Sequence, residues 1–238
     1  MISAFLWGGL AAASLLLGYA LSRRGLSNRT IGIIMGIGSG ALISAIAYEL
    51  IPETIFKGRD MALAFGLGAL AFFAGDWLID NRGGNNRKDI HGSKNTSGSG
   101  AAIFIGTLLD NVPESIILGM SLVFGGTINL AFLTAVFVSN LPEGVAGSIN
   151  LKAAGHSQRQ IFWMWMSLVL LSAASAALGY FLVRWLPMDG RLIQAFAAGA
   201  MLTMLADAMM PEAFEHGGNL VGLFTVFGFL IAAMLSVV

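Results

Sequence analysis

Two short polar blocks interrupt apolar stretches in the middle of the chain. Both read Asn-x-Pro-Glu, at residues 111–114 and again at residues 140–143. The residue before each asparagine is also polar, Asp110 in the first block and Ser139 in the second. Residues four apart share one face of a helix, so Asp110 is expected to face the same way as Glu114. The blocks predict two oxygen-rich faces on two consecutive helices.

The chemistry of these residue types favours a cation site. Polar groups deep in an apolar segment are costly, so they normally face a cavity or a partner. Proline inside a helix exposes the carbonyl four residues earlier, here those of Leu109 and Val138. A single asparagine or proline in such a helix commonly means helix–helix contact or a kink. Two copies of the Asn-x-Pro-Glu block on consecutive spans favour instead a site for a hard or borderline cation. The predicted metal ligands are Asp110, Asn111, Glu114, Ser139, Asn140 and Glu143.

The composition predicts an integral membrane protein. Hydrophobic residues make up 56% of the chain and charged residues only 11%, whereas soluble domains carry roughly 25% charged residues. The net charge is zero, which gives no reason to expect a nucleic-acid partner. The absence of cysteine excludes disulfides and thiolate ligands. No basic segment precedes the first apolar stretch, so we expect a retained span and not a signal peptide.

Eight apolar segments are long enough to cross a bilayer, which takes about 20 residues. We therefore predict an all-α polytopic membrane protein, with one transmembrane domain over residues 1–238 and the lipid bilayer as its surroundings. A polar loop over about residues 81–98 follows the third span. Basic residues concentrate in the odd-numbered connections, which places this loop in the cytoplasm and both termini outside. The predicted spans are roughly 3–22, 31–55, 61–80, 100–123, 128–151, 160–185, 190–214 and 218–238.

A second repeat links spans two and seven. Residues 40–53 and 199–212 both begin with Gly-Ala and end with Pro-Glu. These spans cross the membrane in opposite directions, which predicts an inverted repeat of spans 1–3 and 6–8 around central spans 4 and 5. Carboxylates near the ends of such spans can line an ion pathway or simply reach the membrane–water interface. Glu215 and His216 form either an intermediate metal site on that pathway or a solvated pair. The pathway or gate candidates are Glu49, Glu53, Asp207, Glu212 and His216.

These motifs resemble the ZIP (Zrt/Irt-like) family of divalent metal transporters, especially its bacterial GufA-like branch. The family carries His-Asn-x-Pro-Glu-Gly on span four and Gln-Asn-x-Pro-Glu-Gly on span five, similar to residues 110–115 and 139–144. The similarity continues through residues 148–162 and 196–212. The resemblance implies eight spans, outer termini, a variable cytoplasmic loop and metal ligands on spans four and five. It also implies a homodimer.

The chain departs from the family at several ligand positions. The family histidine of span four is Asp110 here, and the glutamine of span five is Ser139. Span six of the family has a glutamate that helps to hold a second metal, but the matching stretch at residues 172–173 is Ser-Ala and span six has no carboxylate. An all-oxygen site favours manganese, iron(II) or magnesium, or a weaker selectivity for zinc. By resemblance, the first site comprises Asp110, Glu114, Ser139 and Glu143, and Asn111 and Asn140 with the two glutamates form the remnant of the second.

We therefore predict a secondary transporter that moves divalent metal ions across the cell membrane into the cytoplasm. Zn²⁺ is the main expected substrate, and Mn²⁺, Fe²⁺ and Cd²⁺ are the alternatives. Alternating access would move the repeat spans against the central ones. Carboxylates bind metal when deprotonated, so transport should slow at acid pH or be coupled to protons. We expect no enzymatic activity and no resident cofactor, since the sequence shows no phosphate-binding glycine loop and no mid-span histidine. The alternative is a ZIP-like metal sensor or scaffold in the membrane that no longer transports.

Overall fold

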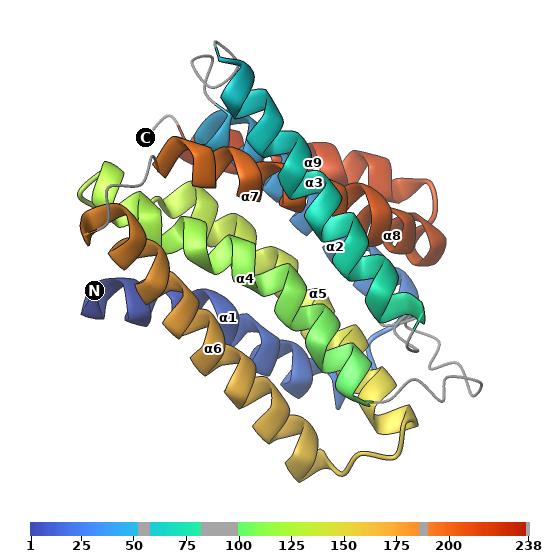
Figure 1. Cartoon of the computed structure of the whole chain (residues 1–238). Coiled ribbons are helices and arrows are strands. Elements are labelled where there is room, and N and C mark those ends of the chain that lie inside the picture. The colour runs from blue at the N-terminus through green and yellow to red at the C-terminus, as the bar shows by residue number, and fades with distance from the viewer. Residues whose placement is uncertain (52–57, 82–99, 186–189, 237–238) are drawn as a thin grey trace.

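The computed structural model describes residues 1–51, 58–81, 100–185 and 190–236. Helices dominate these residues, which contain no strand (Figure 1). Two short π-helical segments, η1 and η4, continue α2 and α7. The elements are α1 (Ile2–Ser22), α2 (Asn28–Ala45), η1 (Ile46–Leu50), α3 (Arg59–Ile79), α4 (Gly100–Phe124), α5 (Leu130–Ala153), α6 (Gln158–Trp185), α7 (Gly190–Met204), η4 (Leu205–Met209), α8 (Met210–Gly217) and α9 (Leu220–Ser236).

These elements confirm the predicted all-α polytopic membrane protein. In the described part of the chain, seven continuous helical segments are long and apolar enough to cross a membrane, counting α2 with η1 and α7 with η4 and α8. The shorter apolar helix α9, with 17 residues, supplies the eighth segment. Large apolar side chains are exposed on the outward faces, for example Leu67 and Phe73 on α3 and Leu223 on α9. Such side chains match the hydrocarbon of a bilayer.

The helices pack as two bundles. α1, α4, α5 and α6 form the first bundle, at the lower left of Figure 1, and α2, α3, α7, α8 and α9 form the second, at the upper right. The most extensive contact between the bundles is that of α2 with α5. Spans one and six therefore pack with spans four and five. The motion of the repeat spans against spans four and five stays a prediction.

The contacts also follow the predicted inverted repeat. α2 packs on α9 as α7 packs on α3, and α1 packs on α5 as α6 packs on α4. Matching glycines allow these close approaches: Gly68 of α3 lies against Phe196 of α7, and Gly228 of α9 lies against Ile37 of α2. Small residues at helix contacts let backbones approach closely in lipid. η1 and η4 occupy equivalent positions of the two repeats, 46–50 and 205–209.

The two mid-span prolines do not interrupt their helices. α4 continues through Pro113 and α5 through Pro142. The departures from α-helical geometry lie instead in the repeat, at η1 and η4. Pro211 follows η4 in the first turn of α8, where a missing N–H costs little. Wide π-helical turns often mark functional segments, and η1 and η4 are such turns within the membrane helices.

Candidate metal centre

All six predicted ligands are buried inside the helical bundle. None is more than 4% exposed, so these side chains cannot reach the membrane surface. All six lie on α4 and α5, more than half of which is buried inside the protein. A group of carboxylates, amides and a hydroxyl at this depth must therefore interact with protein or with a bound ion. The six residues are Asp110, Asn111 and Glu114 on α4, and Ser139, Asn140 and Glu143 on α5.

The two asparagines join the helices directly. Nδ2 of Asn140 donates to Oδ1 of Asn111 at 3.0 Å. Nδ2 of Asn111 in turn donates to the backbone carbonyl of Thr107 at 2.9 Å. The hydroxyl of Ser139 donates to the carbonyl of Val136 at 2.9 Å, which leaves its oxygen able to accept or to coordinate. The structure therefore brings the two Asn-x-Pro-Glu blocks together across α4 and α5.

The carboxylates of these helices do not form a group of three like the one found on α8. Among the described residues, one set of three carboxylate or imidazole side chains places its ligand atoms within 4.8 Å of one another, and that set lies on α8. Asp110, Glu114 and Glu143 do not form such a set. An ion held between α4 and α5 would therefore be shared by carboxylates and by the neighbouring amide and hydroxyl oxygens.

Helix α2 of the second bundle closes over the site. A Cβ atom on Gly38 would lie 2.8 Å from the Cα of Ser139, so only glycine allows this approach. Ser39 follows Gly38 and is fully buried, and its hydroxyl has no hydrogen-bond partner among the described residues. Ser39 is not among the residues predicted from the sequence. The sequence feature that could have indicated it is a small polar residue inside a glycine-rich span.

The pathway candidates fall in different places. Glu49, in η1, accepts a short hydrogen bond from Nδ2 of Asn129. Asn129 also caps α5, since its Oδ1 accepts from the backbone N–H of Phe132 at 2.8 Å. Glu49 is thus tied to the beginning of α5. This link was not predicted from the sequence, although Asn129 precedes an apolar run as N-caps do. Glu53 lies outside the described residues, as does nearly all of the predicted loop 81–98.

The remaining candidates lie at η4 and α8. Asp207 is exposed in η4. Glu212 and His216 are brought together, since Oε2 of Glu212 lies 3.0 Å from Nε2 of His216. These residues are separate from the six on α4 and α5.

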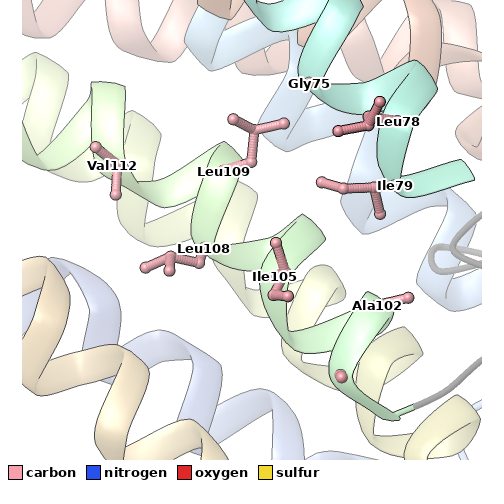
Figure 2. Close-up of a pocket in the computed structure, with 9 residues that line it drawn as sticks. Gly75, Leu78, Ile79, Ala102, Ile105, Leu108, Leu109 and Val112 are labelled. Atoms are coloured by element: carbon pink, nitrogen blue, oxygen red, sulfur yellow. The ribbon is translucent and has the colours of Figure 1, made fainter. Parts of the chain in front are cut away.

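An apolar cavity of about 550 Å³ lies between α3 and α4. Figure 2 shows Leu78 and Ile79 of α3 across from Ile105 and Leu109 of α4. Among the described residues, no carboxylate lines the cavity, although Leu109 directly precedes Asp110. The cavity exists because α3 packs mainly on α7 and only lightly on α4. It is suited to hydrocarbon and not to a metal ion.

The hydrogen bond between the two asparagines should be measurable as a coupling energy. Asn111→Leu and Asn140→Leu keep roughly the same volume and remove the amides. We expect each single change to destabilise the purified protein. The double change should lower the free energy of unfolding by less than the sum of the two single changes. The difference is the coupling energy, which we expect to be about 0.6–1.7 kcal/mol, as for other interhelical hydrogen bonds in membranes. Denaturant unfolding of the four proteins in metal-free detergent gives this value, and additive effects would contradict a direct bond.

Comparison with known proteins supplies one informative similarity. No protein-family model matches the chain. In an alignment of 195 positions that covers 78% of the chain, the sequence is 27% identical to a protein of Arabidopsis thaliana that bears the name "Putative zinc transporter". The aligned region spans 30% of that plant protein. The aligned portion of the chain exceeds three quarters of its length, so the similarity extends across most of the membrane domain and is not confined to the Asn-x-Pro-Glu blocks.

Proposed function

We propose that this chain is a ZIP-type secondary transporter that carries divalent transition-metal ions, with Zn²⁺ as the first expected substrate, into the cytoplasm. The observation that carries the proposal is the buried set of oxygen donors on α4 and α5, joined by the hydrogen bond between Asn111 and Asn140. The similarity to a protein named as a zinc transporter supports it. Assignment to the GufA-like branch, and a location in the cell membrane with both termini outside, belong to the same proposal.

The chemistry of the site suits transient binding of a hydrated dication. Glu114 and Glu143 supply negative charge from two helices, and amide and hydroxyl oxygens replace water around the ion. Asp110 stands where imidazole stands in the ZIP family, so the donors are all oxygen. Oxygen ligands hold zinc less tightly than imidazole or thiolate does, which broadens selectivity toward Mn²⁺ and Fe²⁺. Weaker binding also helps release, and transport requires release.

The two-bundle packing suggests how access could alternate. The proposed site belongs to the first bundle, and α2 of the second bundle covers it at Gly38 and Ser139. A displacement of one bundle against the other would uncover the site toward one side of the membrane at a time. Glu49 in η1 and Asp207 in η4 lie on the second bundle, in the two π-helical turns that the inverted repeat relates, although they are one position out of register with each other. We propose these two residues as gate candidates. The homodimer stays a prediction.

The direct test is metal flux in proteoliposomes. Purified protein in sealed vesicles should take up Zn²⁺ in a saturable manner, and Mn²⁺, Fe²⁺ and Cd²⁺ should compete with it within about tenfold because the donors are all oxygen. An indicator trapped inside the vesicles reports uptake, and protein-free vesicles give the background. Lack of uptake of all four ions, by protein with a normal helical spectrum and a cooperative unfolding transition, would refute transport.

One observation favours a second function. The ligand positions at Asp110 and Ser139 and the stretch Ser172–Ala173 depart from the family pattern, and helix α6 carries no carboxylate. A protein that binds metal without moving it, as a membrane sensor or scaffold, would tolerate these changes. Saturable metal binding in detergent together with zero flux in vesicles would identify this function.

A further inference from the structure

A second group of metal-binding side chains lies outside the proposed transport site. Glu212, Glu215 and His216 on α8 each offer a ligand atom, and these atoms lie within 4.8 Å of one another. Nε2 of His216 is 3.0 Å from Oε2 of Glu212. The imidazole is fully buried, whereas Glu212 is partly exposed and Glu215 is exposed. The group therefore combines one fixed nitrogen donor with two carboxylates that face outward.

Close backbone packing positions this group. Gly217 lies against Gly32 of α2, where a Cβ on Gly32 would overlap the backbone of α8. Gly218 then ends α8 with a φ of +68°, a conformation that suits glycine. Ala213, one residue after Glu212, belongs to the buried apolar cluster that also contains Val145 of α5, and α8 contacts α9 as well as α2. α8 is thus held by two neighbouring helices, and its three donors project from an anchored element.

The donor set differs in kind from that on α4 and α5. A His–Glu pair four residues apart is by itself a common helix ion pair. Here Glu215 adds a second carboxylate, so two negative groups lie beside one imidazole. Three protein ligands of the His-Glu-Glu type, with water completing the shell, suit Zn²⁺, Co²⁺ or Ni²⁺. The α4–α5 site offers only oxygen.

We propose that Glu212, Glu215 and His216 bind a divalent metal ion of the zinc class, at a site separate from the one on α4 and α5. It lies at the end of the membrane domain where α2 begins and α5 ends, since Gly32 contacts α8 and Ile149 packs beside the cluster containing Ala213. Glu143 lies about one helical turn before Ala146 of the same cluster. The second site therefore lies nearer to that end of the membrane domain than the site on α4 and α5 does.

The experiment measures binding in the absence of the first site. The full chain carrying Glu114→Ala/Glu143→Ala is purified in detergent, and radioactive Zn²⁺ is bound by equilibrium dialysis. We expect this protein to retain one Zn²⁺ per chain. Adding Glu215→Gln should weaken that binding by about 10–100-fold, and His216→Gln should weaken it at least as much. His156→Gln is the matched control and should leave it unchanged. Glu215 is exposed, so its substitution does not disturb packing.

A second readout identifies the donor atom. Cu²⁺ bound to imidazole gives a characteristic nitrogen modulation in pulsed EPR, whereas Cu²⁺ bound to oxygen ligands does not. The modulation should disappear in the His216→Gln protein and persist in the His156→Gln protein. The proposal is overturned if the Glu114→Ala/Glu143→Ala protein binds no Zn²⁺, or if neither Glu215→Gln nor His216→Gln weakens binding. These results do not depend on flux, so the transporter proposal can fail while this one stands, and the reverse.

Discussion

Replacing Glu114 and Glu143 together by alanine is expected to abolish metal flux. The two carboxylates supply one negative charge from each of α4 and α5, beside that of Asp110, and both are buried. Changes that merely misorient a metal ligand already cost about 10–100-fold in affinity or activity, so losing two ligands should cost at least the product of two such factors. Initial rates of Zn²⁺ uptake into proteoliposomes, at equal protein content, measure the effect.

Two controls separate chemistry from folding. Glu114→Gln/Glu143→Gln keeps the size of both side chains and should lose flux to the same extent, because amides do not supply the charge. Asp60→Ala removes an exposed carboxylate in the first turn of α3 and should transport normally. Undiminished flux in the glutamine protein would show that these carboxylates are not the ligands, whatever the alanine protein does.

The second large effect concerns stability, at the contact of α3 with α7. Gly68→Ala is expected to destabilise the protein by about 1–3 kcal/mol, the usual cost of overpacking. A Cβ atom at this position would overlap the backbone carbonyl of Phe196, and a backbone cannot move aside as a flexible side chain can. Unfolding in detergent, followed by the helical signal, gives the difference from wild type.

The neighbouring glycine provides a matched control on the same helix. A Cβ on Gly66 would meet nothing within 4 Å, so Gly66→Ala should be neutral or stabilising by up to about 1 kcal/mol through helix propensity. Gly199→Ala, on the facing helix α7, should resemble Gly68→Ala because its Cβ would overlap the backbone of Phe65. Equal stability of the Gly66→Ala and Gly68→Ala proteins would contradict the close approach of α3 and α7.

Features that depend on neighbouring residues were predictable. The predicted spans match the helices within a few residues at most ends, because an apolar stretch of about 20 residues is the length that spans a bilayer. The inverted repeat was visible as two similar stretches. Helical periodicity alone placed Asp110 and Glu114 on one face. These inferences use distances of a few residues along one helix, which the spacing of residues determines directly.

Contacts between distant residues were not predictable in the same way. The hydrogen bond from Asn129 to Glu49 joins residues 80 positions apart, and no pattern in either segment indicates the other. The grouping of spans one and six with four and five depends on which glycine meets which backbone. Glu215 was noted beside His216, but its position relative to Glu212 depends on α8 being a regular helix directly after a π-helical turn.

By itself, the sequence determined that this is a multi-pass helical membrane protein with oxygen donors in the middle of two consecutive spans. Hydrophobicity and helical periodicity act locally, and the bilayer excludes most alternatives. The tertiary structure alone decided how the spans divide into two bundles, that Asn111 meets Asn140, and that α2 closes over Ser139. Those outcomes depend on the detailed shapes of helix surfaces, where one Cβ atom more or less determines whether two backbones can touch.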